Sequence, residues 1–144
     1  MPMNPRVVEL TRNNVNRAFA QTPGVAAAKI YPTAITENVY GDDEDVEFAP
    51  GRDIYAFIQF DAPIKVVKSL GWWREGETLP ILMYLSFVEG LDPKKGDRVV
   101  LPSEEGYMSG VWILNSVKTY GQGEPICWLC SVSQDRSNAF SIPN

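Results

Sequence analysis

Residues 53–60 of this chain read DIYAFIQF, and this stretch decides the class of fold. Alternate side chains of an extended strand point to opposite faces. One face would therefore carry Ile54, Ala56, Ile58 and Phe60, and the other Tyr55, Phe57 and Gln59. Because both faces are largely apolar, we expect a strand that lies centrally in a sheet or crosses between two layers.

Several more strands are predicted around this stretch. Apolar segments with turn residues between them cover residues 79–88, 98–101, 107–117 and 125–132, and the third should be bulged or bent at Gly110. Residues 25–35 are apolar and β-branched, but Pro32 interrupts them, so we expect an edge strand at most. The period of residues 64–73 fits either a helical turn or a strand. The pattern predicts a mainly β fold, a small β-barrel or sandwich with an N-terminal helix and long insertion loops.

The predicted N-terminal helix covers residues 5–20. Asn4 can cap it with Pro5 at the first helical position, and Pro23-Gly24 ends it. Its narrow apolar face is made by Val8, Val15, Ala18 and Phe19. A narrow face of this kind predicts a helix that docks on the body of the protein or lies at a subunit contact.

The length of 144 residues fits one domain. Within residues 1–144 we expect an N-terminal helix or arm (1–24), a β body (25–133) and a polar tail (134–144). The chain has no histidine, which excludes Ser-His-Asp and Cys-His catalysis, zinc sites that contain histidine, and haem sites with a histidine ligand. No run of about 18 apolar residues predicts a membrane-spanning helix. The N-terminus also lacks the basic-then-apolar order of a signal peptide, so the expected place of synthesis and assembly is the cytosol.

The net charge of −5 is unevenly distributed. Residues 1–38 carry four basic and two acidic side chains, a balance of +2, whereas residues 39–61 carry seven acids and only Arg52, a balance of −6. Such segregation suggests complementary contacts with other proteins or with copies of this chain. The alternative is a solvated acidic loop. The net negative charge argues against nucleic-acid binding, which needs a basic face.

Two clusters are candidate chemical sites. The acids Asp42, Asp43, Glu44, Asp45 and Glu47 do not follow the spacing of an EF-hand loop, so a contact surface or a solvated loop is favoured over a calcium site. Cys127 and Cys130 lie in a run of strand formers, where positions three apart point to opposite faces, and no further cysteine or histidine completes a zinc site. We interpret them as half-buried core residues. The sequence therefore predicts no metal, no cofactor and no catalytic residues.

The segment Gly71-Trp72-Trp73-Arg74 is a candidate contact site. In an extended chain the two tryptophans cannot face one core, so one of them would be exposed or would meet a partner. Trp and Arg are also residue types that dominate the energy of interfaces. The alternative is a bent chain that buries both rings.

The C-terminal half carries a resemblance to a known family. Gly71-Trp72 is followed by the apolar strand at 79–88, the turn and strand Pro-Lys-Lys-Gly-Asp-Arg-Val-Val-Leu at 93–101, a strand through Tyr107, Val111 and Ile113, and Gly-Glu-Pro-Ile-Cys-Trp at 123–128. In this order they resemble the small neck proteins of tailed bacteriophages, of the head-closure, stopper or connector type. The resemblance covers about residues 50–132.

The resemblance implies a structural virion protein of the neck, assembled in the host cytoplasm as a homo-oligomeric ring. A portal or adaptor protein would lie on one side and a tail protein on the other. It implies no catalysis, and DNA would pass nearby without specific binding. An acidic loop at 42–47 could close the channel or repel the DNA. The alternatives are a small β-barrel module that binds a peptide or single-stranded nucleic acid, and an enzyme that acts through carboxylates.

Overall fold

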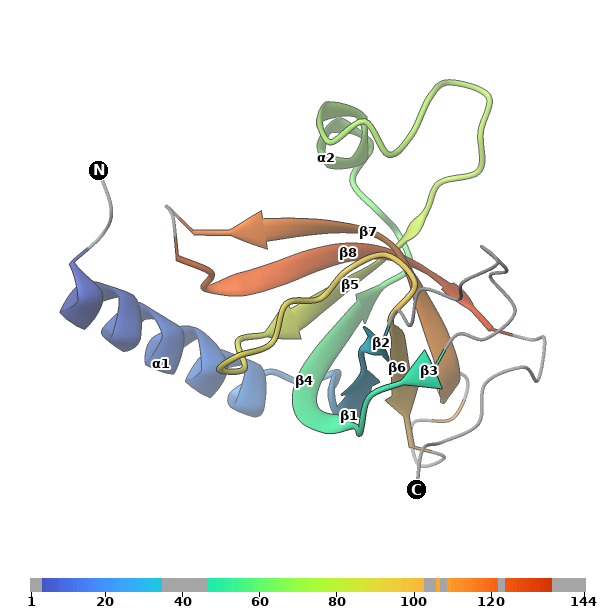
Figure 1. The fold of residues 1–144 in the computed structure, drawn as a ribbon. Coiled ribbons are helices and arrows are strands. Elements are labelled where there is room, and N and C mark those ends of the chain that lie inside the picture. Colours follow the sequence, from blue (N-terminus) through green and yellow to red (C-terminus); the bar gives the residue numbers. More distant parts are fainter. Residues whose placement is uncertain (1–3, 35–46, 103–105, 107–108, 122–123, 136–144) are drawn as a thin grey trace, which may run out of the picture.

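The computed structural model describes residues 4–34, 47–102, 106, 109–121 and 124–135 (Figure 1). Its elements follow in the order α1 (Pro5–Gln21), β1 (Val25–Tyr31), β2 (Thr33–Ala34), β3 (Glu47–Phe48), β4 (Arg52–Gln59), α2 (Ile64–Ser69), β5 (Ile81–Ser86), β6 (Arg98–Leu101), β7 (Gly110–Tyr120) and β8 (Cys127–Gln134). Neither helix in these ranges is long and apolar enough to span a bilayer.

Six strands close into an antiparallel barrel in the order β1-β4-β5-β8-β7-β6. β2 and β3 form a separate two-stranded sheet. The mainly β fold and the barrel are therefore confirmed. The long insertion loops stay a prediction, because residues 35–46 lie outside the described part of the chain.

The core of the barrel consists of the inward-facing residues of all six strands. Ile54, Ala56 and Ile58 of β4 are buried there, as the alternation of residues 53–60 predicts. Phe60, which was expected on the same face, is not buried, because it lies beyond the end of β4 and is 42% exposed. Trp112 of β7 and Trp128 of β8 fill the centre, with 1% exposure each.

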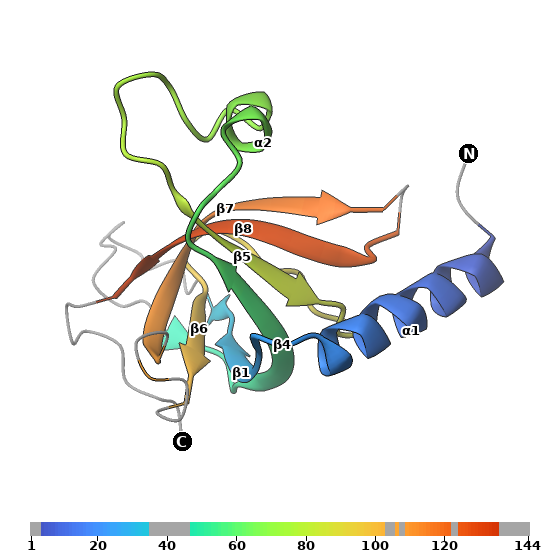
Figure 2. The same cartoon turned by 180° about the vertical axis from the view of Figure 1, so that it is seen from behind.

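A second apolar cluster lies outside the barrel wall. Residues 64–73, whose period fitted either a helical turn or a strand, begin with the short helix α2. Its Val67 is fully buried against Leu82 of β5 and Leu129 of β8. Figures 1 and 2 show α2 outside the barrel, on the side of β7 and β8. Both faces of β5 and β8 are therefore covered, which explains why these strands read as nearly continuous apolar runs.

Two strand predictions were wrong. β1 is not an edge strand, because it pairs with β4 on one side and with β6 on the other. Pro32 ends this strand instead of interrupting it, so the missing N–H costs no ladder hydrogen bond. The irregularity in β7 lies between Leu114 and Ser116, and Gly110 is instead the first residue of the strand, with a φ of +112°.

α1 begins and ends close to the predicted boundaries. The Asn4 side chain accepts a hydrogen bond from the Arg6 N–H at 2.9 Å, and Pro5 occupies the first turn. The helix contacts β1, β4 and β5 on the outside of the barrel and extends beyond them toward its N-terminus (Figures 1 and 2).

Candidate interaction surfaces

Arg12 anchors the middle of α1 to the barrel. Its guanidinium lies 3.8 Å above the centre of the Phe87 ring, and that ring stacks on Trp128 with centroids 5.8 Å apart. The Arg12 Nε also donates to the carbonyl oxygen of Pro125 at 2.7 Å. An ion pair with Glu124 at 3.3 Å is largely solvated on the Glu124 side and contributes little. One side chain thus ties α1 to the loop after β5 and to the end of the β7–β8 hairpin.

Asn16 provides a second anchor one turn later. Its amide nitrogen donates to the Phe87 carbonyl at 3.2 Å, and its oxygen accepts from the Phe87 N–H at 3.1 Å. On the same half of the helix, Val15 and Phe19 line an apolar groove of about 390 Å³ against Phe57 and Tyr84. The Asn16 hydrogen bonds therefore hold the C-terminal half of α1 beside β4 and β5, with this groove between them.

The predicted contact residues of α1 are only partly available to a partner. Val8 is 3% exposed, so it is occupied by this chain's own packing, and Val15 and Phe19 are half-buried in the groove. The exposed aliphatic residues are instead Val7 at 48% and Leu10 at 62%. Sequence reasoning missed both because they lie off the expected apolar face. The sequence indicated them only in that both are large aliphatic residues in a stretch with polar and charged neighbours.

No protein-family model, no curated protein and no solved structure matches this chain. Any assignment of function therefore rests on the chain's own sequence and surfaces.

Both tryptophans of the Gly71-Trp72-Trp73-Arg74 segment pack against the same apolar cluster. Gly71 has a φ of +75°, which bends the chain after α2. Trp72 and Trp73 both pack, half-buried, against the cluster around Val67, and the Trp73 Nε1 donates to the Glu77 carbonyl at 2.9 Å. This is the bent-chain alternative. Arg74 is exposed, so a contact made by this segment would use Arg74 and the outer parts of the rings.

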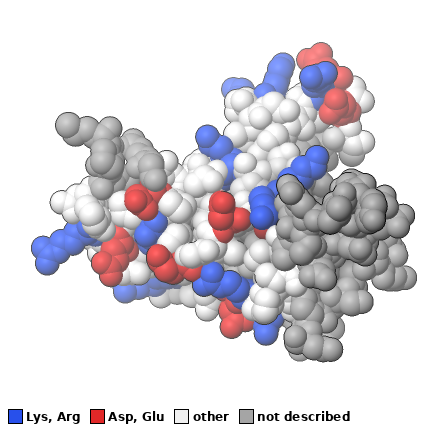
Figure 3. Space-filling view, in the orientation of Figure 1, with Lys and Arg blue, Asp and Glu red and all other residues white. Residues whose placement is uncertain are grey.

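The acidic residues Asp42, Asp43, Glu44 and Asp45 lie outside the described residues. Their role as a contact or channel loop stays a prediction. On the face shown in Figure 3, the charged residues of the described chain intermingle, and neither sign forms a continuous patch there.

The two cysteines have different surroundings. Cys130 lies in the barrel core with no exposed surface, and burial, reinforced by the negative charge of Asp97, raises the pKa of its thiol to about 12. Cys127 is half-buried on the outer face, and burial raises its thiol pKa as well. A thiol that stays protonated is a poor nucleophile. Within the described ranges no cluster of Cys, Asp and Glu could hold a metal ion.

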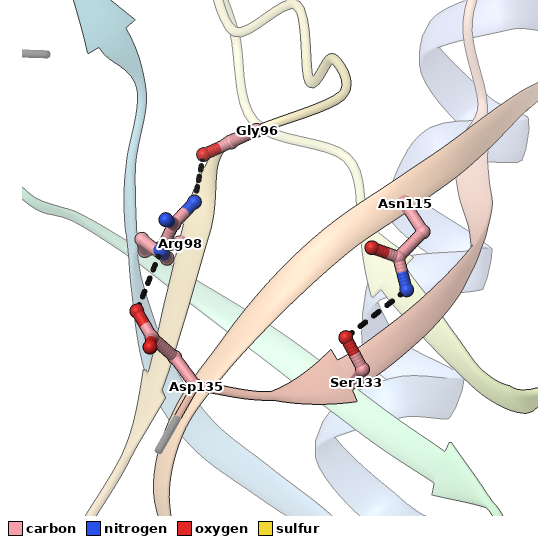
Figure 4. Close-up of polar contacts among 5 residues, drawn as sticks. All are labelled: Gly96, Arg98, Asn115, Ser133 and Asp135. Atoms are coloured by element: carbon pink, nitrogen blue, oxygen red, sulfur yellow. Dashed lines mark hydrogen bonds and ion pairs between the residues drawn. The ribbon is translucent and has the colours of Figure 1, made fainter. Parts of the chain in front are cut away.

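The Lys-Lys-Gly-Asp-Arg turn is built around the buried Asp97. Its Oδ1 accepts hydrogen bonds from the Thr33 N–H at 2.8 Å and the Thr33 hydroxyl at 2.9 Å, and its Oδ2 accepts from the Lys94 N–H at 3.1 Å. The neighbouring Arg98 donates to the Gly96 carbonyl and pairs with Asp135 at 3.1 Å (Figure 4). These contacts tie the start of β2, the start of β6 and the end of β8 together. The residues of this turn therefore have a structural role in closing the barrel.

Proposed function

We propose that this protein is a structural virion protein of the head-to-tail connector, which assembles as a ring between portal and tail and helps to close or conduct the DNA channel. The portal or an adaptor would bind one side of the ring and a tail protein the other. The sequence resemblance suggests this role, and the closed barrel is compatible with it.

The observation that carries the proposal is the surface of α1. Its first turns extend beyond β1, β4 and β5 and expose Val7 and Leu10, whereas Val8 is buried (Figure 1). Arg6 lies one turn before Leu10 and Arg17 about two turns after it, so this aliphatic surface is flanked by positive charge. The opposite charge that could pair with this surface is carried by residues 39–61 of the same sequence, whose net charge is −6. A second copy of this chain is therefore the partner that we assign to α1.

The test is the assembly state of the purified protein, measured by light scattering after size exclusion and by negative-stain electron microscopy. The wild-type chain should form closed rings, and a Val7→Asp/Leu10→Asp variant should not. Ile64→Asp is the matched control, because Ile64 is an exposed aliphatic residue of the other helix, at 51%. A chain that stays monomeric at all accessible concentrations, or rings that the α1 variant leaves intact, would contradict this assignment.

The acidic stretch has its own test. Replacing Asp42, Asp43, Glu44, Asp45 and Glu47 with amides should impair ring formation, DNA retention or DNA ejection. If such virions assemble, retain DNA and eject it normally, the acidic stretch has no part in the channel. Portal and tail genes on either side of this reading frame would support the connector role independently.

The competing reading is a small barrel that binds single-stranded nucleic acid. Such a module should bind oligonucleotides with an affinity that falls steeply as salt rises. The intermingled charges of the face in Figure 3 favour the connector over this alternative.

A further inference from the structure

β7 is longer than the strand beside it. β6 has four residues, which pair with residues 110–113 of β7. β7 then continues to Tyr120, and from Ser116 onward its only paired neighbour among the described residues is β8. Figures 1 and 2 show this end of the β7–β8 hairpin projecting past β6 with no strand along the outer side of β7. Among the described residues, the closed barrel therefore has a local open edge.

The hydrogen bonds identify the backbone groups that face this edge. The Tyr120 carbonyl accepts from the Ile126 N–H at 2.7 Å, so Tyr120 faces β8. The N–H and C=O of one residue point to the same side of an antiparallel strand, and successive residues alternate. Val117 and Thr119 therefore direct their N–H and C=O groups to the open edge. Leu114, before the register shift, uses that same side to bond Gly96 and Asp97, at 2.9 and 3.0 Å.

The side chains around this edge suit an added strand. Val117, Thr119 and Tyr120 are strand-forming residue types, and Thr119 and Tyr120 are exposed. Val117 packs on the core, so a strand laid beside it could bury apolar side chains on its inner face. Unpaired backbone groups at a sheet edge bind extended peptides through main-chain hydrogen bonds.

The charge on the open stretch of β7 itself is positive. Lys118 is exposed and is the only charged residue of β7. α2 stands on the same side of the barrel and carries the exposed residues Lys65 and Lys68 with no acid (Figure 2). Opposite charges on neighbouring strands stabilise their pairing, and like charges oppose it.

We propose that residues 116–120 of β7 bind an extended segment of another protein, added as a strand, with an acidic side chain beside Lys118. The backbone of Val117 and Thr119 supplies the main-chain hydrogen bonds, and Lys118 selects for acidic sequences. The site does not depend on the connector role or on α1.

Amide hydrogen exchange of the wild-type protein, read by NMR, tests the open edge. Alone, the amides of Val117 and Thr119 should exchange at least about tenfold faster than those of Lys118 and Tyr120. The probe is the synthetic peptide acetyl-TVEVTVE-amide, which should slow exchange at Val117 and Thr119 and shift their resonances. Protection of these two amides in the peptide-free monomer would overturn the proposal. Protection that rises with protein concentration alone would assign the edge to a second copy instead, and would equally overturn it.

Two further comparisons test the chemistry of the site. The basic twin acetyl-TVKVTVK-amide should bind about 1.5- to 5-fold more weakly than the acidic peptide, and Lys118→Glu should reverse that order. Thr119→Pro removes an outward N–H and should weaken binding by about tenfold, whereas the matched Thr119→Val keeps it. Equal affinity for both peptides, or equal binding by the two Thr119 variants, would show that the edge is not the site. The Lys118→Glu comparison stands even if Thr119→Pro does not fold.

Discussion

Replacing Asp97 with alanine should lower the free energy of unfolding by about 3–5 kcal/mol. The side chain has no exposed surface and accepts three hydrogen bonds, two from Thr33 and one from Lys94. A hydrogen bond to a charged group contributes about 1.5–3 kcal/mol, so the three together give about 5–9 kcal/mol. Part of this is offset because the variant no longer buries a carboxylate.

Two smaller changes separate the contributions. Thr33→Val removes only the hydroxyl donor and should cost about 1–2 kcal/mol, since the backbone N–H bond to Oδ1 remains. Asp97→Asn keeps an acceptor for Thr33 but turns an amide group toward the Lys94 N–H, so its cost should lie between those of Thr33→Val and Asp97→Ala. The control is Asp92→Ala, an exposed acid of the same segment, which should change stability by less than about 0.5 kcal/mol.

The assay is urea unfolding followed by circular dichroism and tryptophan fluorescence, with a double-mutant cycle between positions 33 and 97. The cycle should give a coupling of about 1 kcal/mol or more, because the two side chains share a hydrogen bond at 2.9 Å. Additive effects of Thr33→Val and Asp97→Ala, or a loss below about 1 kcal/mol for Asp97→Ala, would refute the reasoning.

Three other predictions concern α1, the core thiol and the β7–β8 turn. Arg12→Ala should lower the free energy of unfolding in urea by about 2–4 kcal/mol, because it removes the contact over Phe87 and the bond to Pro125. Arg12→Lys should recover only part of this stability. An Arg12→Ala protein as stable as the wild type would show that α1 is anchored elsewhere. The pKa of the Cys130 thiol is raised from 9.0 to about 12 in the folded protein, so the unfolded chain loses its proton first and stability should fall as pH rises from about 9 toward 12. Cys130→Val should flatten that decline, though Cys127 and Tyr84, whose pKa values are also raised, still act in the same direction; an unchanged pH profile would count against the buried thiol. Gly121→Ala should destabilise the protein by about 2 kcal/mol or more, because φ is +140° and a Cβ would meet the Glu124 carbonyl oxygen. Gly24→Ala should cost only about 1 kcal/mol of stability, because φ is +87° and the nearest atom to a Cβ there lies at 3.5 Å. Equal losses of stability would rule out the steric reason.

Local pattern was sufficient wherever a side chain's face depends only on its own strand. The alternation of Ile54, Ala56 and Ile58 predicts β4 because a period of two fixes which residues turn inward. The capping residue Asn4 and the break at Pro23-Gly24 likewise predict the limits of α1.

Local pattern failed where the outcome depends on a distant partner. Whether β1 is an edge strand is decided by β6, which pairs with it from far along the chain, and Pro32 carries no information about that pairing. The sequence did not predict the interaction surfaces for the same reason. The open edge of β7 arises from a difference in length between two neighbours, and the exposure of Val7 and Leu10 depends on where α1 rests.

The strand order also has a consequence for the growing chain. β1, β4 and β5 are neighbours in the barrel and are complete once Ser86 has been made, whereas β1 and β5 receive their second partners, β6 and β8, only later. Until then this three-stranded sheet has two unpaired margins, a state that invites misassembly. α1 is synthesised before all three strands and contacts each of them. The first helix can therefore shield the outer surface of the sheet while the ribosome is still making the rest of the barrel.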